Sequence, residues 1–176
     1  LAVAEDLCTA PSGGHFRLHP GELTVLQQRR RMLVDCARPV SWAAAEALAL
    51  GAVVRAGAHV RLTGQDVERG TFSQRHAVVV NQDCEAEKVT LLHGVRTLPA
   101  PAAARRDLAG RAAPAPVIAN SPLSEAAALG FEYGYDLAAA PRQRLVLWEA
   151  QFGDFANCAQ TVIDNRKSTR LDSSHT

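Results

Sequence analysis

The pattern of apolar and polar positions predicts two helices in the first third of the chain. From Glu22 to Val34, apolar residues recur at helical spacing among glutamines and arginines. A second, alanine-rich stretch runs from Trp42 to about Arg55. Ser41 is placed to cap its start and Gly57 to close its end. Residues 1–20 have the composition of turns and no sustained period, so we expect a linker or irregular lead-in there.

Strand patterns alternate with further helices in the rest of the chain. Residues 59–63 alternate in polarity as a short strand does, and residues 144–148 form a nearly continuous apolar run of the kind buried in parallel sheets. Another short strand is predicted at residues 117–119, followed by a helix over residues 121–137 that opens with a serine cap and a proline. A last helix is predicted over residues 154–164.

This alternation predicts an α/β fold with a mainly parallel sheet flanked by helices, because right-handed crossovers place helices over such a sheet. The domain is expected to cover residues 21–164. Residues 83–116 interrupt it as a surface loop, and the proline- and alanine-rich part at about residues 96–116 is interpreted as an insertion. Residues 165–176 are polar and aperiodic, so we expect non-native sequence there, with a divergent native tail as the alternative.

Composition and charge narrow the classes of partner. The 176 residues, 47% of them hydrophobic, can fill the core of one domain. Lys and Arg total 19 against 18 Asp and Glu, so the net charge of +1 favours neither nucleic acid nor an anionic membrane surface. No apolar run approaches the ~20 residues of a membrane span. The four cysteines lack the spacing of zinc or redox sites and are expected to be free thiols in a reducing compartment.

A basic triplet, Arg29, Arg30 and Arg31, lies in the first predicted helix. A solvated helix face is the favoured interpretation, because charge runs on amphipathic helices usually face water. A phosphate contact is the alternative.

Polar residues follow three of the predicted strands. The carboxyl ends of parallel strands meet at one edge of a sheet, where ligands bind in folds of this class. The residues at these ends therefore indicate a site, although loops are polar in any protein. They are Gln65, Asp66, Arg69 and Arg75 after the first strand, Asn120, Ser124 and Glu125 after the second, and Glu149, Gln151, Asp154 and Asn157 after the third.

Five blocks of sequence carry a resemblance to a known family. In order and spacing they resemble the transketolase-like, pyrimidine-binding domain of the 2-oxoglutarate dehydrogenase family, over nearly all of residues 16–164 except the insertion. The blocks are FRLHP from Phe16, WAAAEALALG from Trp42, HVRLTGQDVERGTFSQRH from His59, NSPLSEAAALGFEYGYDL from Asn120 and LWEAQFGDFANCAQTVID from Leu147.

The resemblance implies the decarboxylating component of a 2-oxo acid dehydrogenase complex, an oxidoreductase. Such enzymes use thiamine diphosphate to decarboxylate 2-oxoglutarate or 2-oxoadipate, and they pass the acyl group to a lipoyl group on a partner acyltransferase. In related enzymes another domain holds the diphosphate and Mg²⁺, and the cofactor lies between two subunits of a homodimer. We therefore expect no metal ligands in this chain and no activity from it alone. The location implied is the mitochondrial matrix in a eukaryote and the cytoplasm in a bacterium.

The resemblance assigns the catalytic carboxyl group to Glu125, the glutamate of the Leu-Ser-Glu motif. In this family that group protonates the aminopyrimidine ring of the cofactor, so that the opposite amino group can remove the thiazolium proton. A position in the first helical turn favours the ionised form, whereas burial raises a carboxyl pKa, and the mechanism requires burial to dominate in the assembled enzyme. A solvated helix position, on the face shared with Leu129 and Glu132, is the alternative for Glu125.

Three further residues are assigned to the cofactor by the same resemblance. Phe152 matches the aromatic residue that transketolase-like enzymes stack on the pyrimidine, because a flat apolar ring fixes its orientation. Core packing is the alternative for Phe152. Gln65 and Asp66 stand where related enzymes line the cofactor pocket.

Substrate contacts are expected in the same region. Arg69 and Arg75 suit a distal substrate carboxylate, because a guanidinium fork binds carboxylates with two hydrogen bonds. His76 is a candidate for holding the substrate, and a histidine that merely satisfies a loop is the alternative. Several members of the family carry histidine where Gln74 stands, and the glutamine is more similar to the branch that prefers 2-oxoadipate.

Two other functions remain open at the level of sequence. The chain could be a non-catalytic α/β interaction module that kept the fold and lost the chemistry, against which the presence of Glu125 argues. It could also belong to another transketolase-like enzyme, an interpretation that the block from Trp148 to Asn157 disfavours.

Overall fold

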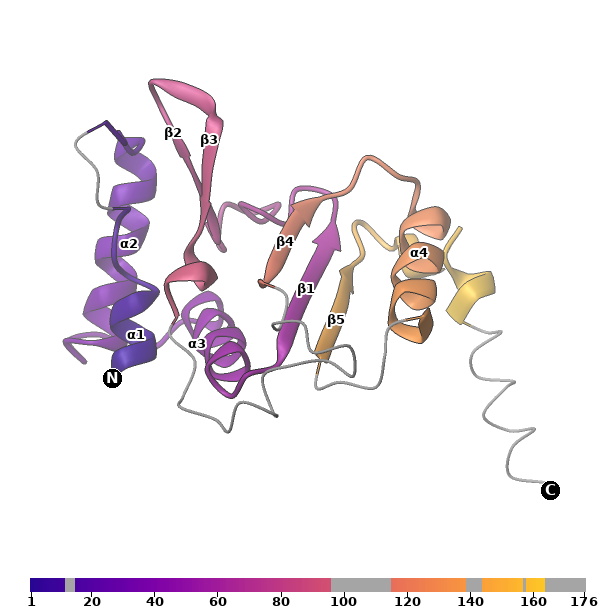
Figure 1. Cartoon of the computed structure of the whole chain (residues 1–176), viewed down its shortest axis with the longest axis horizontal. Coiled ribbons are helices and arrows are strands. Elements are labelled where there is room, and N and C mark those ends of the chain that lie inside the picture. The colour runs from indigo at the N-terminus through magenta and orange to yellow at the C-terminus, as the bar shows by residue number, and fades with distance from the viewer. Residues whose placement is uncertain (12–14, 96–114, 139–143, 157, 164–176) are drawn as a thin grey trace, which may run out of the picture.

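The computed structural model describes residues 1–11, 15–95, 115–138, 144–156 and 158–163 (Figure 1). The helices are α1 (Ala2–Asp6), α2 (Pro20–Leu33), α3 (Trp42–Arg55) and α4 (Glu125–Ala138), with short 3-10 helices η1 (Leu91–Gly94) and η3 (Asp154–Ala156). The strands are β1 (His59–Gly64), β2 (Val78–Asn81), β3 (Cys84–Thr90), β4 (Val117–Asn120) and β5 (Arg144–Glu149). Residues 160–163 are helical, within the span predicted for the last helix.

A three-stranded parallel sheet forms the centre of the fold, with the strand order β4, β1, β5 (Figure 1). Leu62 of β1 pairs with Ile118 of β4 on one side and with Leu147 of β5 on the other. The three predicted strands are confirmed, and so is the α/β class with a mainly parallel sheet flanked by helices. The apolar strand β5 is half-buried along its length rather than fully buried, because it lies at one end of this strand order.

The alternation of side chains along β1 places helices on both faces of the sheet. Arg61 points to α4, where it forms a bidentate ion pair with Glu132, with N···O distances of 2.6 and 2.8 Å. Val60 and Leu62 point to the other face, where they join the main apolar cluster with residues of α3. The central strand is therefore covered by α3 on one face and by α4 on the other.

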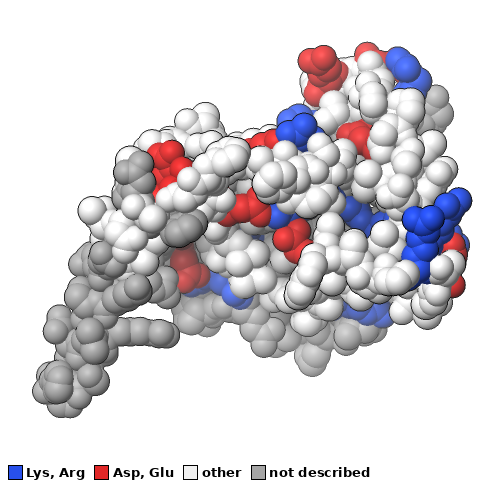
Figure 2. Space-filling model, turned by 180° about the vertical axis from the view of Figure 1, so that it is seen from behind, with Lys and Arg blue, Asp and Glu red and all other residues white. Residues whose placement is uncertain are grey.

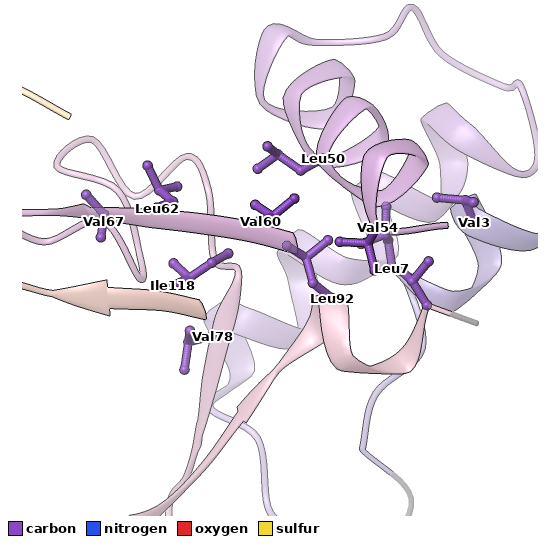
Figure 3. Packing of buried hydrophobic residues seen from close by; sticks show 11 residues of the cluster. Val3, Leu7, Leu50, Val54, Val60, Leu62, Val67, Val78, Leu92 and Ile118 are labelled. Atoms are coloured by element: carbon purple, nitrogen blue, oxygen red, sulfur yellow. The ribbon is translucent and has the colours of Figure 1, made fainter. Parts of the chain in front are cut away.

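The main core lies between the sheet, α3, α1 and η1 (Figure 3). Val60 and Val67 are completely buried there, and Leu50 and Val54 of α3 pack against them. Burial of such side chains contributes about 1.5–3 kcal/mol each. The cluster of buried residues comprises Val3, Leu7, Leu50, Val54, Val60, Leu62, Val67, Val78, Leu92, Val95 and Ile118.

The lead-in prediction for residues 1–20 is wrong in part. Residues 2–6 form α1, and Val3 and Leu7 are buried against Gly51 of α3, where an added Cβ would lie 2.6 Å from Val3. This segment is too short for a helical period to stand out, and tertiary packing supplies its stability. At the other end of the lead-in, the His19 side chain caps α2 by accepting a hydrogen bond from the backbone N–H of Gly21 at 3.1 Å.

Two further predictions are corrected between residues 78 and 125. Residues 84–94, predicted as part of a surface loop, form β3 and η1, and the antiparallel partner β2 was not predicted. The polar strand β3 is exposed along most of its length, so its residues show no apolar alternation. The helix predicted from Ser121 begins at Glu125, and residues 121–124 instead connect it to β4.

The prediction that Arg29 faces water is also wrong. Its side chain is 4% exposed and donates hydrogen bonds to the backbone carbonyls of Leu7, at 3.1 Å, and Arg75. Burial lowers the pKa of the Arg29 guanidinium, and the two carbonyls provide its hydrogen-bond acceptors. Arg30 and Arg31 are exposed as predicted.

Charges of both signs are interspersed on the face shown in Figure 2. The four cysteines are free, as predicted, and burial raises the pKa of the Cys8 thiol. No helix among the described residues is long and apolar enough to cross a membrane. Most of the predicted insertion, residues 96–114, and the predicted non-native tail lie outside the described residues.

The close approach of β5 leaves no room for a side chain at Gly64, the last residue of β1. A Cβ at this position would lie 2.5 Å from the backbone oxygen of Glu149. Gly64→Ala is therefore expected to reduce the free energy of unfolding by about 2 kcal/mol, as overpacking does. Gly134 of α4 has nothing within 4 Å of an added Cβ, so Gly134→Ala is expected to be neutral or stabilising. Urea unfolding of both variants checks the prediction, and equal effects would contradict it.

Candidate functional site

The three strand ends meet in one pocket, as predicted. Apolar side chains form part of its wall, and three carboxylate residues also line it. The side chains around it lie so close together that the space between them does not admit a water molecule. Complete ligand sites usually enclose about 300–1,000 Å³, so these residues form only one wall of a larger site. The lining residues are Gly64, Gln65, Ser121, Leu123, Glu125, Ala128, Trp148, Glu149 and Asp154.

Hydrogen bonds between the loops hold the first two strand ends together. The backbone N–H of Ser121 donates to the carbonyl of Gly64 at 2.8 Å. The side-chain oxygen of Asn120 accepts from the backbone N–H of Glu68 at 3.0 Å. These bonds continue the parallel pairing of β1 and β4 beyond the strands, and they position the segment that leads into α4.

Glu125 lies at the start of α4 and is half-buried in the pocket wall. Leu123 and Ala128 line the pocket beside it, and Trp148 does so from β5. No described residue forms a hydrogen bond or ion pair with the Glu125 carboxylate. A carboxylate held against apolar groups without a protein partner is available to a ligand.

The other two carboxylates of the pocket have partners within the protein. Asp154 accepts a hydrogen bond from the backbone N–H of Gln151 at 3.1 Å. Glu149 is paired with the guanidinium of Arg75. These partners leave Glu125 as the carboxylate of the pocket with no described partner.

A second groove lies beside the pocket and shares Glu149 with it. Phe152 lines this groove and is 91% exposed, which is incompatible with the core-packing alternative. Phe72 also lines it and is 83% exposed. Phe72 was not identified from the sequence, because a single phenylalanine in a loop gives no sign of its exposure. The groove therefore presents two aromatic side chains next to the pocket.

Gln65 and Asp66 follow β1, and both were predicted to line the cofactor pocket. In the structure only one of them does so. Gln65 is one of the lining residues, and its backbone carbonyl accepts a hydrogen bond from the side chain of Gln151. Asp66 is not among them, and its carboxylate is paired with Arg69. Asp66 has a φ of +55°, in the left-handed region, so the chain turns away from the pocket directly after Gln65.

Arg75 is buried and does not lie on a binding surface. Its side chain is 4% exposed and its guanidinium bridges Glu46 of α3 and Glu149 of β5. Burial lowers the pKa of Arg75, but the hydrogen bonds to the two glutamates outweigh this effect and raise it. The geometry favours a structural role for Arg75 over the predicted contact with substrate.

His76 lies beside α2 and does not line the pocket. Burial lowers the pKa of its imidazole, the charge of Glu22 opposes this effect, and the result is a pKa below the ordinary value. The backbone N–H of His76 donates to the carbonyl of Arg69 at 2.9 Å. His76 and Arg69 therefore belong to the loop around the groove, whereas Glu125 and Gln65 belong to the pocket itself.

Comparison with known proteins explains this arrangement of strand ends. Residues 38–173 match the family described as transketolase, pyrimidine binding domain. The chain belongs to this family. The match includes all three strands of the parallel sheet and the whole pocket, so a transketolase-like pyrimidine-binding domain is the correct description of the fold.

Several relatives are named as 2-oxoglutarate dehydrogenases. The chain is 45% identical over 162 residues to the mitochondrial 2-oxoglutarate dehydrogenase of Dictyostelium discoideum, covering 92% of this chain and 14% of the relative. It is 44% identical over 164 residues to the mitochondrial enzyme of Saccharomyces cerevisiae, with the same coverage of 92% and 14%. A bacterial relative, the multifunctional 2-oxoglutarate metabolism enzyme of Mycobacterium sp. (strain JLS), is 44% identical over 162 residues, which are 92% of this chain and 12% of that protein.

The chain thus spans only 12% to 14% of the length of these relatives. The resemblance to the 2-oxoglutarate dehydrogenase family is confirmed for the part that the chain covers. These identities do not separate the 2-oxoglutarate branch from the 2-oxoadipate branch.

Proposed function

We propose that this chain is the pyrimidine-binding part of a longer thiamine-diphosphate-dependent enzyme, the decarboxylating component of a 2-oxo acid dehydrogenase complex. The observation that supports this most strongly is the Glu125 carboxylate, which lies in the pocket at the carboxyl ends of the parallel strands without a described protein partner. Glu125 is also the glutamate of the Leu-Ser-Glu motif. Position in the fold and position in the sequence therefore agree on the same residue.

We propose that the lining of the pocket forms one wall of the binding site for the pyrimidine ring of thiamine diphosphate. Leu123, Ala128 and Trp148 offer apolar surface to a flat ring, and Glu125 offers a carboxyl group to a ring nitrogen. When bound, the cofactor supplies the electron sink that stabilises the charge left by decarboxylation. Glu125 would donate a hydrogen bond to a ring nitrogen of the bound cofactor, and Gln65 would complete the wall of the pocket.

Phe152 is the proposed aromatic contact of the cofactor ring. Its side chain is almost entirely exposed beside the pocket, so packing against the described residues does not account for it. An aromatic residue in this state is stabilised when a flat ligand or a second protein surface covers it. Phe72, on the same groove, is available for the same purpose.

The remaining parts of the site are proposed to lie outside this chain. The pocket is smaller than a complete cofactor site, which suits a site shared with another domain and with the second subunit of a homodimer. Among the described residues, no group of three or more His, Cys, Asp or Glu side chains could hold a metal ion. We propose that Mg²⁺ and the diphosphate bind to the other domain, as the family resemblance implies.

The proposed substrate is 2-oxoglutarate or 2-oxoadipate, and the proposed acceptor is a lipoyl group on an acyltransferase partner. Names of the relatives support a 2-oxo acid substrate, and Gln74 supports the 2-oxoadipate branch. Arg69 is half-exposed at the rim of this region and remains the proposed contact for a distal carboxylate, with His76 in the same loop. The relatives include mitochondrial and bacterial enzymes, so we propose the mitochondrial matrix or the bacterial cytoplasm as its location.

The proposed function is tested with the full-length protein and the isolated 176 residues. With thiamine diphosphate and Mg²⁺, the full-length protein is expected to decarboxylate at least one of the two 2-oxo acids, and the isolated chain neither. Carbon dioxide release with each substrate measures this and decides between the branches. Turnover by the isolated chain would contradict the proposal that this chain contributes only part of the active site. No turnover by the full-length protein would favour a non-catalytic module.

A further inference from the structure

Arg75 connects three separate parts of the fold through one guanidinium group. Its Nε donates to Glu46 of α3 at 2.7 Å, and its Nη1 donates to the backbone carbonyl of Val67 at 3.1 Å. The same Nη1 donates to the Glu149 carboxylate at 3.0 Å. The Nη2 atom donates to both glutamates. All three nitrogens of the guanidinium are therefore used within the protein, and none is left for a substrate.

Glu149, the last residue of β5, is where this network reaches the functional region. It lines both the pocket that contains Glu125 and the groove that contains Phe72 and Phe152. Its carboxylate is 29% exposed, and both of its oxygens accept hydrogen bonds from Arg75. A carboxylate bound at both oxygens by a rigid planar fork has little freedom to rotate.

We propose that Arg75 is a positioning residue that fixes Glu149 as the wall between the pyrimidine pocket and the aromatic groove. This inference rests on the proposed function. Glu46 of α3 also binds the guanidinium of Arg75, by accepting hydrogen bonds from its Nε and Nη2 atoms. The group of Glu46, Arg75 and Glu149 carries a net charge of −1. It would therefore place a fixed negative charge beside the proposed position of the ring, which gains positive character when it accepts a proton.

Two features of the loop support this role. The backbone carbonyl of Arg75 accepts a hydrogen bond from the buried Arg29, so both the main chain and the side chain of Arg75 are fixed by hydrogen bonds. The side chain of Gln151 bonds both the backbone of Gln65 and the hydroxyl of Thr71, which ties the loop after β1 to the segment after β5. Arg75 thus belongs to a preorganised wall rather than to a mobile binding loop.

The inference is tested by the affinity of the full-length protein for thiamine diphosphate, measured by calorimetry in the presence of Mg²⁺. Glu149→Gln keeps the shape of the side chain but removes its charge. It is expected to weaken binding about tenfold, because the negative charge beside the protonated ring is lost. Glu46→Gln lies outside the pocket and is expected to weaken binding about threefold through Arg75 alone. Substrate KM with saturating cofactor is expected to change less than cofactor affinity.

Glu132→Gln is the matched control, because it interrupts the other buried Arg–Glu pair, with Arg61, away from the pocket. It is expected to lower the unfolding midpoint while leaving the affinity for thiamine diphosphate unchanged. If all three variants weaken binding in proportion to their loss of stability, the positioning role is overturned. It is also overturned if neither Glu46→Gln nor Glu149→Gln changes the affinity while the wild type binds the cofactor, a result that leaves the proposed function standing. A wild type that does not bind overturns both.

Discussion

Replacing Glu125 by glutamine is expected to reduce thiamine-diphosphate-dependent decarboxylation by the full-length protein at least about a hundredfold, the lower range for loss of a positioned acid or base. Glutamine keeps the size of the side chain but cannot supply the proton. The unfolding midpoint is expected to change little, because the carboxylate is half-buried and has no hydrogen bond or ion pair with the described residues. Initial rates at saturating cofactor, together with thermal unfolding, check both parts.

Glu85→Gln provides the matched control for this experiment. Glu85 lies on the exposed strand β3 and does not line the pocket, so the same chemical change there is expected to leave the rate unaltered. Unchanged turnover in Glu125→Gln would remove this carboxyl group from the mechanism. A lost fold in that variant would instead show that Glu125 has a structural role that its present surroundings do not suggest.

The position of the pocket was predictable from the sequence, because it depends on strand order and on the ends of strands. Each strand carries a period or an apolar run of its own, and parallel pairing then brings the three carboxyl ends together. Glu125 and Gln65 reach the pocket for this reason. Asp66 does not, since one residue in the left-handed region is enough to redirect the chain, and nothing in the local sequence predicts it.

The buried charges could not be predicted in the same way. Arg29 was expected to face water and Arg75 to contact a substrate carboxylate. Both are buried instead, and their hydrogen-bond partners come from distant segments. Glu132 was expected to share a helix face with Glu125, yet its side chain is 6% exposed and pairs with Arg61. Such pairs depend on tertiary contacts between residues far apart in sequence, for which hydrophobic periodicity gives no signal.

Glu132→Leu is expected to lower the free energy of unfolding by about 3 kcal/mol, the usual cost of removing one partner of a buried ion pair. Arg61 would be left between the sheet and α4 without the carboxylate whose hydrogen bonds raise the pKa of its guanidinium. The contacts of Arg61 with the rings of Tyr135, at 4.7 Å, and Phe131, at 5.6 Å, offset only part of this loss. Urea unfolding followed by circular dichroism measures the change.

Two controls separate the buried pair from charge in general. The double variant Arg61→Met with Glu132→Leu is expected to recover most of the stability, because it removes the charge that Glu132→Leu alone leaves buried. Asp83→Asn removes a carboxylate paired with Arg17 on the surface, where solvent screens the interaction, so it is expected to have little effect. A single variant as stable as the wild type would show that α4 is held to the sheet by its apolar contacts, and that Arg61 finds water when Glu132 is absent.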